Sequence, residues 1–252
     1  MPTAHTITTD DGETLVAVHH PPDAPTSDTW LVFCHGFVSD KSGSYAERCR
    51  RAVDEGYHAV RFDFRGCGDS EGAFVDQTLS SKIVDLRAVL DHFDAPSYAL
   101  VGSSFGAKTA FHATVGFDAD ADDVGGQVRA IAGRAPLTYN RAFDHLRGVV
   151  EREGQFTYDT GHTVDGRFFA DFERYAFDDV TADLSVPVAL FHGAADDSVP
   201  LRDSLDATAS FDVDVSLQVF AREGHRFSRR AEARFRRGLF DWLARTLLAE
   251  SD

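Results

Sequence analysis

Residues 98–115 read YALVGSSFGAKTAFHATV, and this stretch decides the expected fold. The apolar run from Tyr98 to Val101 predicts a buried strand, and residues 105–115 predict a helix. Between them lies Gly102-Ser103-Ser104-Phe105-Gly106, a GxSxG pattern in a strand-turn-helix context. Side chains at the two glycine positions would collide with neighbouring backbone at so sharp a turn. The glycine spacing selects Ser104 over the adjacent Ser103 as a nucleophile at the edge of a sheet.

Short apolar runs alternate with amphipathic stretches on both sides of this turn. Such alternation predicts an α/β fold with a mostly parallel central sheet of about eight strands and helices on both faces. An Asp10-Asp11-Gly12 turn between residues 5–9 and 13–20 predicts an antiparallel hairpin at the start of the chain. The other predicted strands are 30–34, 58–64, 98–101, 128–132, 188–191 and 215–220, and the predicted helices are 44–55, 79–93, 105–115 and 229–248.

A single domain over residues 1–252 is expected, because α/β domains of this length are often undivided and no linker or internal repeat interrupts the chain. Residues 137–185 break the alternation, since they are long, aromatic and charged and contain no clear strand. We interpret them as a small cap insertion over the site, with a short helix at 167–177. A structural excursion without a role in binding remains the alternative.

A general base and an acid are expected downstream of Ser104. A serine hydroxyl becomes nucleophilic when an imidazole accepts its proton and a carboxylate orients that imidazole. Asp196 lies in a polar turn after the predicted strand 188–191, and His225 lies in a loop after the predicted strand 215–220. Both positions are at the carboxyl ends of parallel strands, where sites of α/β proteins form. Asp197 competes with Asp196 for the acid role, and His192 and His162 compete with His225.

An oxyanion hole is predicted from two main-chain amides. His35-Gly36-Phe37 follows the predicted strand 30–34, where the turn can direct the Phe37 N–H at the same point as the Phe105 N–H. Two such donors stabilise the oxyanion of a tetrahedral intermediate. His35 itself is interpreted as a structural hydrogen-bonding residue.

Together these segments resemble the α/β-hydrolase superfamily, and within it the branch of cinnamoyl esterases, lysophospholipase-like enzymes and serine aminopeptidases. The resemblance covers nearly the whole chain outside 137–185 and includes the run RFDFRGCGDSEG at 61–72. It implies Ser104 as nucleophile, Asp196 as acid, His225 as base, and Phe37 and Phe105 as oxyanion donors. Cys67 departs from the family pattern, because many relatives have histidine there, but this position belongs to the scaffold.

Hydrolysis of a small-molecule carboxylic ester through an acyl-serine intermediate is the leading hypothesis, and it requires no cofactor. Peptide cleavage of the aminopeptidase kind and a catalytically idle binding protein are the alternatives. A cluster of acidic residues that could hold a substrate ammonium would favour peptide cleavage, and the candidates are Glu151, Glu153, Asp171 and Glu173. Six phenylalanines would line an acyl pocket or form plain core, a choice the sequence leaves open: Phe143, Phe156, Phe168, Phe169, Phe172 and Phe177.

The charge of the chain excludes some partners and suggests an environment. Its net charge is −16, from 41 acidic and 25 basic residues, and Lys41, Lys82 and Lys108 are its only lysines. Nucleic acid is not an expected partner, because such a surface repels phosphates. Many aspartates with few lysines are typical of proteins from salt-accumulating halophiles, in which salt screens self-repulsion.

Cysteine and hydropathy patterns favour a cytoplasmic protein. Cys34, Cys49 and Cys67 are too few and too scattered for a disulfide framework, which fits a reducing compartment. The N-terminal residues have neither a basic start nor an apolar run, and no segment of about 18 consecutive apolar residues occurs. Neither secretion nor membrane insertion is expected. No metal site is expected either, because no spacing such as HExxH occurs.

Overall fold

The computed structural model describes residues 1–116 and 127–248, so residues 117–126 and 249–252 of the predicted domain 1–252 lie outside the described residues. Within the described residues, eight strands form one sheet in the order β1-β2-β4-β3-β5-β6-β9-β10. All neighbours from β4 to β10 pair in parallel, whereas β1 pairs with β2, and β2 with β4, in antiparallel fashion. The predicted sheet and its opening hairpin are therefore confirmed. The strands are β1 (Thr3–Thr8), β2 (Thr14–His20), β3 (Thr29–Cys34), β4 (Ala59–Phe62), β5 (Ser97–Ser103), β6 (Val128–Arg134), β9 (Val188–Gly193) and β10 (Val215–Phe220).

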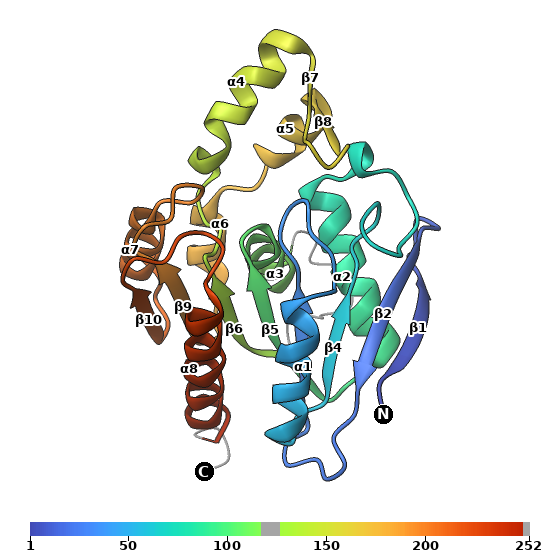
Figure 1. Ribbon diagram of the computed structural model, residues 1–252, viewed down its shortest axis with the longest axis vertical. Helices are drawn as coiled ribbons and strands as arrows, with labels where there is room; N and C mark the ends of the chain where they lie inside the picture. Colours follow the sequence, from blue (N-terminus) through green and yellow to red (C-terminus); the bar gives the residue numbers. More distant parts are fainter. Residues whose placement is uncertain (117–126, 249–252) are drawn as a thin grey trace.

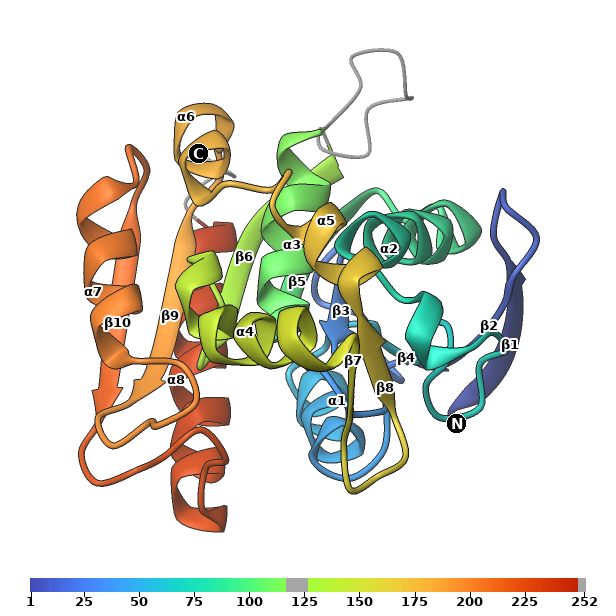
Figure 2. The same ribbon diagram turned by 90° about the horizontal axis from the view of Figure 1, so that it is seen from above.

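Helices cover both faces of the sheet, as the alternating pattern predicted. Figure 2 shows α1 (Ser44–Asp54) and α8 (Arg229–Leu248) on one face, and α2 (Leu79–Phe93) and α3 (Phe105–Val115) on the other. Successive residues of a strand point to opposite faces, so each central strand contributes to two cores. In β3, Leu31 packs in the core beneath α1 and α8, whereas Val32 packs in the core beneath α2 and α3. Because helices cover both faces of this sheet, functional groups can reach solvent only at the ends of its strands.

Segment 137–185 contains more regular structure than the sequence indicated. The expectation of one short helix at 167–177 and no strand was wrong, because α5 (Gly166–Phe172) ends well before α6 (Phe177–Asp183) begins. A two-stranded antiparallel hairpin of β7 (Gln155–Thr157) and β8 (Thr163–Asp165) follows α4 (Asp144–Glu153). Strands of three residues are too short for a period-2 pattern to be recognised. Helix α7 (Leu201–Ser210) also has no counterpart among the predicted helices.

Most of segment 137–185, from α4 to α5, lies above the carboxyl ends of the central strands (Figure 1). Figure 1 shows α4, α5, β7 and β8 beyond the ends of the central strands, whereas the C-terminal end of α8 lies at the opposite end of the molecule. The chain leaves β5 at Ser103, β9 at Gly193 and β10 at Phe220, so Ser104 and the two predicted downstream residues emerge at these carboxyl ends. Within residues 1–116 and 127–248, no helix combines the length and the apolar character needed to cross a bilayer.

Candidate active site

Ser104 occupies a strained turn between β5 and α3. Its backbone has φ 51° and ψ −116°, a region that residues with a side chain rarely adopt. The flanking glycines are required sterically, since a Cβ at Gly102 would lie 2.3 Å from the Cα of Ala107. A Cβ at Gly106 would lie 2.3 Å from the carbonyl oxygen of Cys34. The close packing of α3 against β3 and β5 therefore accounts for the glycine spacing seen in the sequence.

Asp196 and His225 are in direct contact. The Nδ1 atom of His225 lies 2.8 Å from Oδ2 of Asp196, and a carboxylate only accepts, so Nδ1 carries the proton and Nε2 is left as an acceptor. The other carboxylate oxygen accepts hydrogen bonds from the amides of Ser198 and Val199, both at 2.9 Å. These two amides and the imidazole leave the Asp196 side chain no freedom to rotate.

His192 is a second support for Asp196 and does not replace His225. It is fully buried, and its Nε2 lies 3.2 Å from Oδ2 of Asp196 and 2.9 Å from the carbonyl oxygen of Val199. Its Nδ1 accepts a hydrogen bond from the Ser204 hydroxyl at 2.7 Å. Burial raises the pKa of Asp196, but hydrogen bonds from His192 and His225 outweigh burial and hold this pKa well below its ordinary value. The Asp196 carboxylate is therefore ionised near pH 7.

The other competitors have different surroundings. Asp197 is exposed, and its carboxylate accepts a hydrogen bond from Ser198 at 3.4 Å instead of contacting an imidazole. His162 lies after the turn of the β7–β8 hairpin, where its ring packs 4.4 Å from that of Phe74 and its Nδ1 lies 2.7 Å from the Thr160 hydroxyl. Neither residue contacts Asp196 or His225 through a hydrogen bond in the part of the chain that the structure describes.

The two predicted oxyanion donors lie on loops that pack together. An added Cβ at Gly36, the residue before Phe37, would lie 3.5 Å from the Cβ of Ser104. His35 supports this loop, because its Nδ1–H donates to the Gly36 carbonyl at 2.8 Å and its Nε2 accepts from the Phe64 amide at 3.1 Å. Among the described residues, no group accepts a hydrogen bond from the amide of Phe37 or Phe105. Neither amide is therefore engaged by a partner within the described residues.

Ser104 and His225 line one cavity of about 680 Å³ beneath segment 137–185. No hydrogen bond joins the Ser104 hydroxyl to the imidazole of His225 within the described residues, and in enzymes without ligand such hydrogen bonds are often long. We call the apolar part of its lining the apolar wall, and it consists of Phe37, Val38, Ala142, Phe143, Leu146, Tyr158 and Val199. The polar part includes Asp197, Ser198 and Arg226.

Segment 137–185 contributes the larger share of the apolar wall. Of its phenylalanines, Phe143 lines the cavity, whereas the side chains of Phe168 and Phe172 are fully buried behind it, against Phe105. Phe143 is therefore a cavity residue, whereas Phe168 and Phe172 are core residues.

The four acids that would favour peptide cleavage do not border the cavity. Asp171 accepts hydrogen bonds from Ser80, Glu173 pairs with Arg147, and Glu151 and Glu153 lie on the exposed surface of α4.

A buried lysine that the sequence analysis did not single out joins this segment to the core. Lys108 of α3 is fully buried, and its Nζ donates to the carbonyl oxygens of Thr138 and Tyr175, both at 3.1 Å. Burial lowers the pKa of Lys108 to about 7. Thr138 lies before α4, and Tyr175 lies between α5 and α6. The Lys108 amine therefore binds the chain both before and after the elements α4, β7, β8 and α5, which lie over the site.

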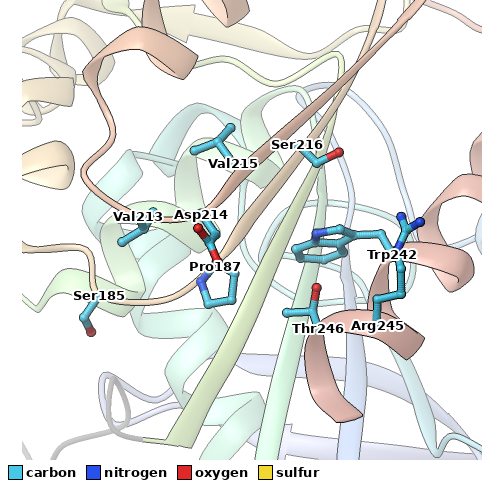
Figure 3. A pocket seen from close by; sticks show the side chains of 9 residues that line it. All are labelled: Ser185, Pro187, Val213, Asp214, Val215, Ser216, Trp242, Arg245 and Thr246. Carbon is cyan, nitrogen blue, oxygen red and sulfur yellow. The ribbon is translucent and has the colours of Figure 1, made fainter. Parts of the chain in front are cut away.

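Other parts of the molecule offer weaker candidates. A cavity of about 590 Å³ lies between β9, β10 and α8 (Figure 3), and its lining includes Asp214, Trp242 and Arg245. It lies beside the amino-terminal ends of β9 and β10, away from Ser104. Within residues 1–116 and 127–248, no group of three or more His, Cys, Asp or Glu side chains has the geometry to hold a metal ion.

Comparison with known proteins agrees with this architecture. A model of the alpha/beta hydrolase family matches residues 31–237. The mitochondrial palmitoyl-protein thioesterase ABHD10 of Bos taurus is 25% identical over 215 residues, which cover 80% of this chain and 68% of that protein. The mouse protein is 27% identical over 217 residues, covering 80% and 70% respectively.

Solved structures extend the likeness to nearly the whole chain. Est1E from Butyrivibrio proteoclasticus, solved with ferulic acid bound, superposes with a TM-score of 0.83 at 18% identity, covering 97% of this chain and 100% of that one. Mouse ABHD10 superposes with a TM-score of 0.82 at 19% identity, covering 96% and 99%. These matches confirm the predicted α/β-hydrolase fold.

Proposed function

The chain belongs to the α/β-hydrolase family, and from this premise we propose that it is a serine hydrolase that cleaves carboxylic esters through an acyl-serine intermediate at Ser104. One observation carries the proposal. Ser104, presented by a strained turn, and His225, whose imidazole is hydrogen-bonded to Asp196, border the same cavity. No cofactor takes part in this reaction.

Each step of the proposed reaction uses a named atom. As the Ser104 oxygen attacks the ester carbonyl, Nε2 of His225 accepts the hydroxyl proton, and Asp196 stabilises the imidazolium that results. The amides of Phe37 and Phe105 donate to the oxyanion of the tetrahedral intermediate. His225 then gives its proton to the departing alcohol, and water repeats the sequence to release the acid and restore Ser104.

The cavity favours an apolar acyl group over a charged substrate. We propose that segment 137–185 is a small cap of a single domain and that Phe143, Leu146 and Tyr158 contact the acyl chain. The curated relatives named above are called thioesterases, so a thioester is a second candidate substrate, which the same acyl-serine chemistry would cleave. Peptide cleavage loses its main support, because the acidic residues proposed to hold an ammonium group do not border the cavity.

The proposal is tested by covalent labelling and by substrate comparison. A fluorophosphonate should modify Ser104 and no other residue, as located by mass spectrometry of peptides. Nitrophenyl esters and acyl thioesters of increasing chain length should be hydrolysed in molar salt, and aminoacyl anilides should not. Labelling at another residue would contradict the assignment of Ser104. Absence of both labelling and turnover over a broad ester panel would favour a non-catalytic binding protein.

We also propose that the protein works in the cytoplasm of a salt-accumulating cell. All three lysines are buried, so the exposed side-chain cations among the described residues are arginines. The three cysteines are buried and unpaired, which is compatible with a reducing compartment. Under this proposal, salt screens the repulsion among exposed carboxylates and so stabilises the compact state.

Thermal unfolding should therefore shift upward as potassium chloride rises from 0.1 M to molar concentration. For a domain of this size each kcal/mol raises the midpoint by about 2–4 °C, so a few kcal/mol of relieved repulsion should appear as a rise of about 10 °C. The matched control is the variant Asp23→Asn/Asp28→Asn/Asp241→Asn, which removes three exposed charges and should show a smaller salt dependence. A midpoint that stays constant or falls with salt would argue for an ordinary acidic protein.

A further inference from the structure

Arg134 contacts the main chain on both sides of the proposed reaction centre. It is the last residue of β6 and pairs with Ser103 in the parallel register of β5 and β6. Its carbonyl oxygen accepts a hydrogen bond from the Ser104 amide at 3.0 Å. Its guanidinium Nη2 donates to the carbonyl oxygen of His225, also at 3.0 Å. Arg134 thus connects the nucleophile turn, through its main chain, with the loop that bears the imidazole, through its side chain.

The Arg134 guanidinium is itself held in place. Its Nε lies 3.5 Å from Oε2 of Glu232 on α8, and its Cζ lies 4.6 Å from the ring centroid of Phe227. Only 12% of the side chain is exposed. The Phe227 ring limits the plane of the guanidinium, and Glu232 attracts it by charge without a hydrogen bond to Nε.

Glu232 joins this contact to a second arginine, which reaches the residue before Ser104. Arg48 of α1 is buried, and it donates to Glu232 through Nε at 2.7 Å and through Nη2 at 3.2 Å. Its remaining terminal nitrogen, Nη1, donates to the Ser103 hydroxyl at 2.9 Å. The Arg48–Glu232–Arg134 cluster therefore contacts the Ser103 hydroxyl, next to Ser104, through Arg48 and the His225 carbonyl through Arg134.

The loop that carries His225 needs such an anchor because of its place in the fold. It follows β10, which lies at the end of the strand order and pairs only with β9. Asp196 holds the ring of His225 at Nδ1. Elsewhere in the loop, the Glu223 carbonyl accepts from the Ala195 amide at 2.9 Å, and the Glu223 carboxylate accepts from Ser228. The hydrogen bond from Arg134 acts on the main chain of His225 itself, so it bears most directly on where Nε2 lies relative to Ser104.

We propose that Arg134, held by Glu232 and Arg48, is a positioning residue that sets the approach of the His225 imidazole to the Ser104 hydroxyl. The inference rests on the proposed hydrolase function and names a requirement of that site. A buried cluster of charges contributes little net stability once desolvation is counted, whereas its directed hydrogen bonds define geometry. Arg134 acts through the main chain and does not touch the substrate.

The test compares Arg134→Met with Arg236→Met. Both changes remove one arginine that lies near Glu232, but Arg236 pairs with Glu47 and makes no hydrogen bond to the His225 loop. Hydrolysis of a short nitrophenyl ester is measured per active site, counted by fluorophosphonate titration. Because a misplacement of about 1 Å can cost about 100-fold, Arg134→Met should lower kcat by about 10- to 100-fold. Its KM should stay within about two-fold of the wild-type value, since ground-state binding is unaffected.

Two further measurements separate positioning from a general loss of structure. The rate of phosphonate labelling should fall in Arg134→Met by a factor similar to that of kcat, because His225 activates Ser104 in both reactions. Arg134→Lys, which keeps the charge but not the planar fork, should restore only part of the rate. Arg236→Met should change kcat and the labelling rate by less than about two-fold.

An unchanged kcat in Arg134→Met, or a rise in KM alone, would overturn the proposal. If Arg134→Met does not fold, Glu232→Gln is the variant to measure. Glutamine keeps the shape of the Glu232 side chain but weakens its attraction for both arginines. Unchanged turnover in Glu232→Gln would also overturn the proposal. Failure of the wild-type protein to label at Ser104 is a different result, which contradicts the proposed hydrolase function itself.

Discussion

Replacing Ser104 by alanine should lower kcat for a short-chain ester by about five to six orders of magnitude, since the attacking oxygen is lost and only binding and oxyanion stabilisation remain. The thermal midpoint should hardly change, because alanine keeps the Cβ that already tolerates φ 51° at this turn. Initial rates with a nitrophenyl ester and thermal unfolding of the same sample measure both effects.

The control for Ser104→Ala is Ser185→Ala. Ser185 is an exposed serine that borders the cavity of Figure 3, at the other end of the sheet. This variant should retain both turnover and phosphonate labelling. Retention of more than about one hundredth of the wild-type rate in Ser104→Ala would show that another nucleophile carries the reaction.

Asp196→Asn should lower kcat by about four orders of magnitude, although the side chain keeps its shape. The Asn carbonyl oxygen should stay with the amides of Ser198 and Val199, which donate to Oδ1 of the aspartate. Its NH₂ group then faces Nδ1 of His225 as a donor, so the imidazole must carry its proton on Nε2 instead. An imidazole in that tautomer cannot accept the proton of Ser104. Steady-state rates near neutral pH measure the loss.

Asp197→Asn is the matched control, since it removes the same charge one residue later from a side chain that does not contact His225. Its kcat should fall by less than about tenfold. If Asp197→Asn proved the more damaging change, the competitor that the sequence left open would be the acid, and the contact between Asp196 and His225 would have only a structural role.

The regular part of the fold was predictable because local sequence and tertiary packing agree there. Helices α2, α3 and α8 begin and end where the periodicity placed them, and every strand of the large sheet has a predicted counterpart. A strand such as β5, buried on both faces, has an apolar run at its centre, from Tyr98 to Val101, so its sequence is distinctive. The glycines around Ser104 were equally informative, since the contacts at Gly102 and Gly106 exclude any larger residue.

Segment 137–185 was not predictable to the same degree. Its helices have seven to ten residues and its strands three, and elements this short depend on their packing against the rest of the molecule more than on local preference. The two hydrogen bonds from Lys108 illustrate the point, because nothing in the local pattern relates a lysine of α3 to the carbonyl groups of Thr138 and Tyr175.

By itself, the sequence determined the class of fold, the identity of the presented serine and the loops from which its partners come, because periodicity and glycine spacing express local steric requirements. Only the tertiary structure decided that Asp196, and not Asp197, meets His225, that His192 supports this carboxylate, and that Arg134 connects Ser104 to the His225 loop. The physical reason is that hydrogen bonds are short and directional. Apart from His192 and Asp196, which are four positions apart, these groups are separated by 29 to 91 positions and satisfy them only after the strands have been placed side by side.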